Sequence, residues 1–136
     1  MRLWVLPALG AFVVWGLWGF LPKITVRYIS PKSALVYEIL GGMLVAIVVL
    51  CTLNFRPDIH PKGMALGITT GILGFLGALF FLLAVSEGPL SLIAILTALS
   101  PVISILLAIL VLNEPMTLQQ GVGIVFALAA ILLIAC

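Results

Sequence analysis

The sequence GPLSLIAILTALSPVISILLAILVLNEP, residues 88–115, decides the fold class of this chain. Its 24 residues from Pro89 to Leu112 include no charged side chain. As an α-helix rising about 1.5 Å per residue, this segment would be about 36 Å long, whereas a bilayer hydrocarbon core is about 30 Å thick. The segment is therefore predicted to be a membrane-spanning helix.

Pro101 lies near the middle of this segment. An interior proline costs a helix about 3 kcal/mol in water, but membrane helices accept one when neighbouring groups satisfy the freed carbonyl. The pattern predicts a kinked helix. The hydroxyl groups of Thr97, Ser100 and Ser104 are predicted either to bond to nearby backbone or to line a polar path through the bilayer.

The composition extends this prediction to the whole chain of 136 residues. Hydrophobic residues make up 65% and charged residues 7%, whereas a soluble domain is about 25% charged. The apolar runs are long and continuous, unlike the short alternating segments of a barrel. The predicted class is an all-α integral membrane protein, multi-pass, in the cell (inner) membrane. A net charge of +2 is too small for a nucleic-acid surface, and no His/Cys cluster has metal-ligand spacing. We expect no nucleic-acid partner, metal or cofactor, and no enzymatic activity.

The chain is predicted to form one transmembrane domain, residues 1–136, with five spans at about 3–28, 31–53, 63–85, 89–112 and 117–135. The third span carries glycines at intervals of four and then three residues. They are Gly63, Gly67, Gly71, Gly74 and Gly77. Such a face suits close packing against another helix.

Basic residues in short loops set the orientation of a membrane protein. With five spans, each side of the membrane would receive three of the six basic residues. Arg2, Arg56 and Lys62 share one side, and Lys23, Arg27 and Lys32 share the other. This balance predicts insertion in both orientations and an antiparallel homodimer, which would rebuild an inverted-repeat transporter from two copies. The alternative is a fixed topology enforced by the cell.

Glu38 is an acidic residue inside a predicted span, about seven residues from its start and roughly 10 Å deep. A charge at the bilayer centre costs at least about 2.5–3.5 kcal/mol, and loss of water favours the protonated form of a carboxyl. Trp15, Trp18 and Tyr37 could supply aromatic faces for an organic cation. Glu38 is thus predicted to bind either a proton or a cationic substrate. Alternatively, Lys23 lies at the same depth in an antiparallel helix pair and neutralises Glu38.

Several motifs together resemble the EamA family of the drug/metabolite transporter superfamily. They are Trp15-Gly16, the run from Ala84 through Glu87-Gly88-Pro89 to Leu99-Ser100-Pro101, and Leu112-Asn113-Glu114 followed by Gln120-Gly121. The resemblance covers the whole chain as one five-span repeat. It implies exporters and permeases for small metabolites, usually built from two inverted repeats, with spans one, three and four lining the path.

The resemblance implies that this chain is one half of such a transporter, similar in principle to the small multidrug resistance proteins, which work as antiparallel dimers. The family often has an arginine after an aromatic residue where this chain has Tyr37-Glu38, so no anion preference is carried over. The expected function is export of a small polar or cationic metabolite, coupled to protons. The alternatives are a flippase subunit for lipid-linked headgroups and a non-transporting partner of a homologous half-transporter. Expected partners are a second copy or that half-transporter, a small-molecule substrate and membrane lipid.

Overall fold

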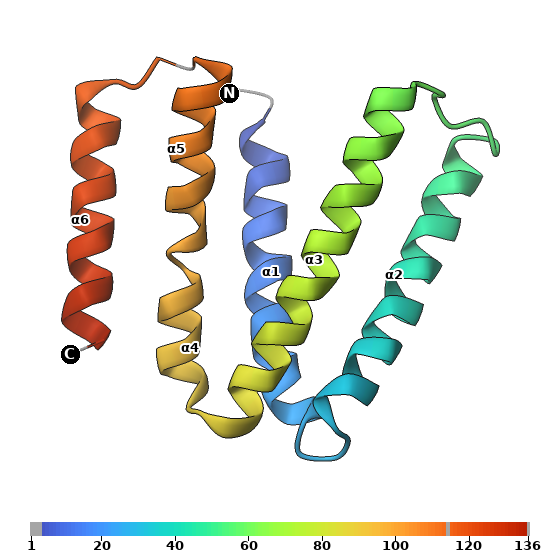
Figure 1. Cartoon of the computed structure of the whole chain (residues 1–136), viewed down its shortest axis with the longest axis horizontal. Coiled ribbons are helices and arrows are strands. Elements are labelled where there is room, and N and C mark those ends of the chain that lie inside the picture. Colours follow the sequence, from blue (N-terminus) through green and yellow to red (C-terminus); the bar gives the residue numbers. More distant parts are fainter. Residues whose placement is uncertain (1–3, 114, 136) are drawn as a thin grey trace. The chain divides into compact units, whose positions relative to one another are not determined.

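The computed structural model describes residues 4–113 and 115–135, and within them every regular element is an α-helix (Figure 1). The helices are α1 (Val5–Thr25), α2 (Pro31–Thr52), α3 (Pro61–Glu87), α4 (Leu90–Thr97), α5 (Ser100–Leu112) and α6 (Leu118–Ala135). They form two units, α1–α3 and α4–α6. Arg2 and Glu114 lie outside the described residues.

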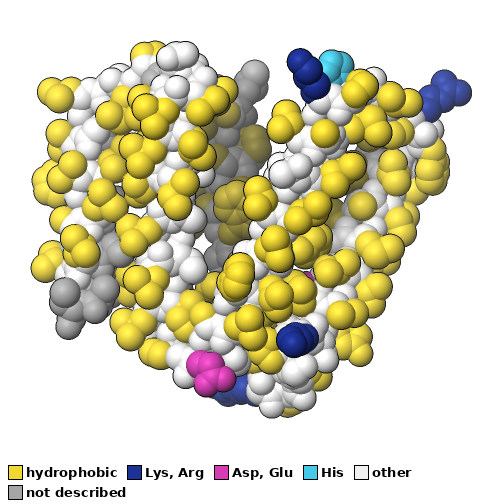
Figure 2. Space-filling model, viewed as in Figure 1, with side chains coloured by type: hydrophobic (Ala, Val, Ile, Leu, Met, Phe, Trp, Pro, Cys, Tyr) yellow, Lys and Arg dark blue, Asp and Glu magenta, His cyan; other side chains and the backbone are white. Residues whose placement is uncertain are grey.

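Four stretches of the described chain are long and apolar enough to cross a membrane. They are α1, α2, α3 and the 23 residues Leu90–Leu112 that hold α4 and α5. Figure 2 shows a face covered largely by hydrophobic side chains, with Lys and Arg near the helix ends. The predicted all-α integral membrane class is confirmed. The fifth predicted span falls on α6, which has 18 residues, and a total of five crossings stays a prediction.

A capping side chain followed by a proline starts both α2 and α3. The Ser30 hydroxyl accepts a hydrogen bond from the Ser33 N–H at 3.3 Å, and Pro31 occupies the first turn of α2. A proline fits there because its missing N–H would have no partner inside the helix. At α3, the His60 imidazole accepts from the Gly63 N–H at 3.2 Å through Nδ1, so His60 serves as a cap for the helix start.

The buried side chains of the first unit gather at one end, where α1 ends, α2 begins and α3 ends. They are Pro22, Ala34, Ala78, Phe81, Leu82 and Val85. Leu82 and Val85 are 0% exposed, whereas every residue of α3 from 61 to 77 is exposed. The three helices are therefore held together mainly at this end.

The glycine face of α3 is open in the structure. A Cβ atom added at Gly67, Gly71, Gly74 or Gly77 would meet no atom of α1 or α2 within 4 Å. Within the described residues of the first unit, the predicted close packing of this face does not occur. The tight glycine is Gly42 on α2, where an added Cβ would lie 3.2 Å from Cζ of Phe75.

In the second unit, the predicted kink at Pro101 takes the form of an interruption at Ala98 and Leu99, between α4 and α5. Proline has no N–H for the carbonyl four residues earlier, and its ring crowds that carbonyl. The helix tightens around the gap, since the Val102 N–H bonds to the Leu99 carbonyl at 3.0 Å. The Thr97 hydroxyl donates to the carbonyls of Ile93 and Ala94 at 3.0 and 3.1 Å, which fits the predicted bonding to nearby backbone.

Candidate functional site

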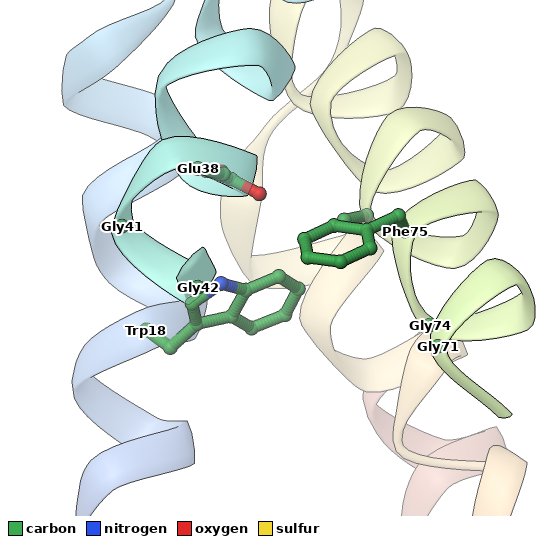
Figure 3. A pocket seen from close by; sticks show the side chains of 8 residues that line it. Trp18, Glu38, Gly41, Gly42, Gly71, Gly74 and Phe75 are labelled. Atoms are coloured by element: carbon green, nitrogen blue, oxygen red, sulfur yellow. The ribbon is translucent and has the colours of Figure 1, made fainter. Parts of the chain in front are cut away.

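A cleft of about 530 Å³ lies within the first unit, between α1, α2 and α3 (Figure 3). Its lining residues are Trp18, Glu38, Gly41, Gly42, Gly71, Gly74, Phe75 and Ala78. All three helices contribute, and the cleft lies next to the packed end of the unit. Small molecules commonly bind in clefts of this size.

Glu38 brings the cleft its charge. The residue is half-buried on α2, and Figure 3 shows its carboxyl group pointing into the cleft, toward the side where the Phe75 ring lies. Gly41 and Gly42 follow three and four residues later, so they lie on the same face of the helix one turn further on. The space beside Gly41 is open, since an added Cβ there would meet nothing within 4 Å, whereas the space at Gly42 receives the Phe75 ring.

Trp18 provides the aromatic wall on α1. Its ring packs against Phe81 of α3, with ring centroids 5.5 Å apart and planes tilted by 30°. Phe81 is buried, so this contact attaches the indole to the packed end of the unit. One wall of the cleft is therefore an indole that packs against a buried ring.

Phe75 provides the opposite aromatic wall, and the sequence reasoning missed it. Phe75 lies on α3 in one stripe with Gly71, Gly74 and Ala78, at spacings typical of one helix face. Its ring reaches α2 at Gly42, where the space left by the missing Cβ receives it. An aromatic residue set between glycines on a single stripe is the sequence signal for this wall, and the glycine spacing by itself predicts close helix packing.

The structure brings together only part of the predicted site. Glu38 and Trp18 line the same cleft. Trp15 and Tyr37 do not line it, and their side chains are 72% and 64% exposed.

The predicted path-lining residues stand apart from this cleft in the chain. Thr97 lies on α4, and Ser100 and Ser104 lie on α5, all in the second unit. The role of these three hydroxyl groups in a transport path stays a prediction.

Lys23, the residue proposed to neutralise Glu38, binds the backbone of α3. Its Nζ donates to the carbonyl oxygen of Val85 at 2.7 Å. This contact gives the ammonium group a role at the end of α3 that does not involve Glu38. The lining of the cleft contains one carboxyl group and no basic side chain among the described residues.

The cleft is therefore suited to a proton or a cation, with aromatic faces on two sides. A bound metal ion would need several ligands. Among the described residues there is no group of three or more His, Cys, Asp or Glu side chains that could hold one.

Long apolar helices around an acidic cleft define an integral, multi-pass α-helical membrane protein. More particularly, the chain belongs to the EamA-like transporter family, which matches residues 2–136. The family predicted from the sequence motifs is thus confirmed.

Two relatives differ in how much of their length this chain covers. One, from Bacillus subtilis, is named "Uncharacterized transporter YyaM" and is 32% identical over 117 residues, which are 84% of this chain. This chain spans only 38% of that relative. The other, "Uncharacterized protein MJ1333.1" from Methanocaldococcus jannaschii, is 29% identical over 123 residues, covering 90% of this chain and 89% of that protein. No solved structure matches the chain.

Proposed function

We propose that this chain is a membrane transporter subunit that exports a small polar or cationic metabolite in exchange for protons. The observation that carries the proposal is the half-buried Glu38 carboxyl group facing a cleft within an apolar helical unit. Membership of the EamA-like transporter family and the name of the Bacillus subtilis relative support a transport role.

The coupling follows from the cost of an exposed charge in the bilayer. A deprotonated Glu38 without a counter-charge is unfavourable at this depth, so the carboxyl group holds either a proton or a cationic substrate. One carboxylate cannot hold both. When protons arrive from the side where they are abundant, Glu38 becomes neutral and releases the substrate. When the proton leaves on the other side, the carboxylate can bind substrate again.

The assembly proposed is an antiparallel homodimer, with a homologous half-transporter as the alternative second subunit. Basic residues occur near both ends of the first unit. Lys23, Arg27 and Lys32 lie around the α1–α2 connection, and Arg56 and Lys62 lie at the α2–α3 connection. This arrangement gives little preference for one orientation, so two copies in opposite orientations can enclose a site between repeats.

Glu38→Gln tests the coupling. In proteoliposomes with an imposed pH gradient, the unaltered protein should accumulate or release a transported cation, and Glu38→Gln should abolish that proton-driven flux because a neutral amide binds neither proton nor cation in the same way. The measurement is the flux of radiolabelled amines, sugars and amino acids, because exchange of one proton for one monovalent cation moves no net charge and gives no current.

Glu87→Gln is the matched control, because Glu87 is acidic, exposed and at the end of α3, outside the cleft. It should transport like the unaltered protein. Proton-driven flux that persists in Glu38→Gln would overturn the coupling scheme. Flux seen only with lipid-linked substrates would favour a flippase, and flux seen only after adding a second half-transporter would favour the partner role.

A further inference from the structure

The cleft lining offers fewer kinds of polar group than a general metabolite site. Of the described residues that line the cleft, Glu38 supplies the charge and the Trp18 indole N–H supplies the side-chain donor. The other lining residues are four glycines, Phe75 and Ala78. The site therefore offers a negative charge, two aromatic rings and exposed helix surface, with no hydroxyl, amide or basic side chain.

This lining disfavours several classes of substrate. A carboxylate or phosphate on the ligand would face Glu38 with no positive side chain in the lining to balance it. A sugar would exchange its hydrogen bonds to water for a surface with one side-chain donor, and unpaired polar groups are costly when water is removed. Zwitterions, anions and polyols are thus poor ligands for this cleft.

An organic ammonium ion matches the same lining. Its charge balances Glu38, and its carbon surface lies against the Trp18 and Phe75 rings, whose faces attract cations. A quaternary ammonium group needs no hydrogen-bond acceptor, so its carbon surface suits a cleft with few polar groups. Figure 3 shows the two rings and the carboxyl group bordering one space.

We propose that the cleft between α1, α2 and α3 is a binding site for small quaternary ammonium ions that carry no anionic group, and that Phe75 sets the width of the site. The proposal deepens the proposed function and rests on it for the transport of the bound ion. Phe75 determines width because its ring spans from α3 to Gly42 on α2.

Three small molecules of similar size test the charge requirement. Choline has a trimethylammonium group, 3,3-dimethylbutan-1-ol replaces that nitrogen with uncharged carbon, and glycine betaine adds a carboxylate to the trimethylammonium group. Binding of radiolabelled choline to the protein in lipid nanodiscs is measured by equilibrium dialysis, with the other two as competitors. Both should compete about tenfold or more weakly than unlabelled choline, since one lacks the cation and the other faces Glu38 with its own anion. Equal competition by either molecule, or no choline binding, would overturn the proposal.

The width assignment is tested by the ratio of affinities for tetrabutylammonium and tetramethylammonium. Phe75→Ala should raise this ratio because it removes the ring that spans the cleft. Gly42→Ala should lower the ratio, since its Cβ would lie 3.2 Å from Phe75 Cζ and push the ring into the cleft. Leu73→Ala, an exposed residue of α3 that does not line the cleft, is the matched control and should leave the ratio unchanged. A ratio that stays constant in both cleft variants would overturn the role of Phe75.

The outcomes separate this inference from the proposed function. Glu38-dependent, proton-driven flux of a zwitterion or a sugar with no choline binding would uphold the proposed function and overturn this inference. Selective choline binding with no flux in proteoliposomes would uphold the site and overturn the transport role.

Discussion

Lys23 links the end of α1 to the end of α3 through a hydrogen bond from its Nζ to the carbonyl oxygen of Val85. The Val85 carbonyl is among the last four of α3, which have no partner within the helix. A cation at this position also interacts favourably with the negative end of the helix dipole. The side chain therefore stabilises the packed end of the first unit.

Replacing Lys23 with methionine should lower the stability of the first unit. Lys23→Met keeps most of the length but loses the bond to Val85, and the expected loss is about 1 kcal/mol for a half-buried contact. The measurement is the midpoint of thermal unfolding in detergent. Arg27→Met is the control because Arg27 is an exposed cation at the same end of the unit. Equal midpoints for the two variants would show that the Val85 contact contributes nothing.

Single residues of the site could be predicted to different degrees. Glu38 was identifiable because a charge in an apolar segment is rare, and Trp18 because aromatic residues accompany cation sites. Phe75 gave a weaker signal, its place in the glycine stripe of α3, and its role depends on where α3 packs against Gly42. Tyr37 does not line the cleft with Glu38, because neighbouring residues point about 100° apart around a helix.

The interruption between α4 and α5 is the most irregular feature among the helices. Because Pro101 cannot donate a backbone hydrogen bond, the helix is interrupted by a turn at Ala98 and Leu99. Thr97 adds hydroxyl bonds to the last turn of α4. The segment Leu90–Leu112 therefore consists of two shorter helices rather than one uniform rod.

Pro101→Ala should join α4 and α5 into a continuous helix. Alanine restores the missing N–H and has the highest helix propensity, so amides 98–102 should exchange hydrogen for deuterium more slowly. The experiment is hydrogen exchange with mass spectrometry on protein in nanodiscs. Pro89→Ala, at the N-cap of α4, should leave exchange at 98–102 as it was. Unchanged exchange in Pro101→Ala would show that Pro101 does not cause the interruption.

At the level of elements, the sequence predicts helices well and their packing poorly. Long uncharged runs predict helices because every backbone N–H and C=O group in a bilayer must be hydrogen-bonded, and a helix pairs them within one segment. The residues at which Leu90–Leu112 is interrupted depend on local hydrogen bonds such as that from Val102 to Leu99. The open glycine face of α3 depends on tertiary packing, which spacing alone does not specify.

On the face shown in Figure 2, the Lys and Arg side chains lie near the helix ends and hydrophobic side chains cover most of the surface. In the first unit, basic side chains lie at both the α1–α2 and the α2–α3 connection. Each group favours the orientation that places its own connection in the cytoplasm, so the two groups act against each other. The proposed antiparallel pairing depends on this balance. A change of one charge is therefore expected to shift the distribution of orientations.

The orientation can be measured with a cysteine at position 58, in the α2–α3 connection, after Cys51 and Cys136 are replaced by serine. A membrane-impermeant maleimide applied to intact cells should label about half of the Asp58→Cys chains if insertion is dual. Adding Tyr28→Lys, at an exposed residue of the α1–α2 connection, should hold that connection in the cytoplasm and raise the labelled fraction. Labelling of nearly all or nearly none of the chains without Tyr28→Lys would rule out dual insertion.

The uneven packing along α1–α3 has a mechanical consequence. Leu82 and Val85 are buried at one end of α3, whereas the helix from residue 61 to 77 is exposed. If α3 tilts, the packed end is therefore the pivot and the exposed part moves most. At about 1.5 Å per residue, Phe75 lies about 15 Å along the helix from Val85. A small tilt of α3 about this end would move the Phe75 ring farther than the Phe81 ring, which lies nearer the packed end and contacts Trp18. Such a tilt would change the distance between the Phe75 and Trp18 rings, and so the width of the cleft, while the packed end of the unit stays closed.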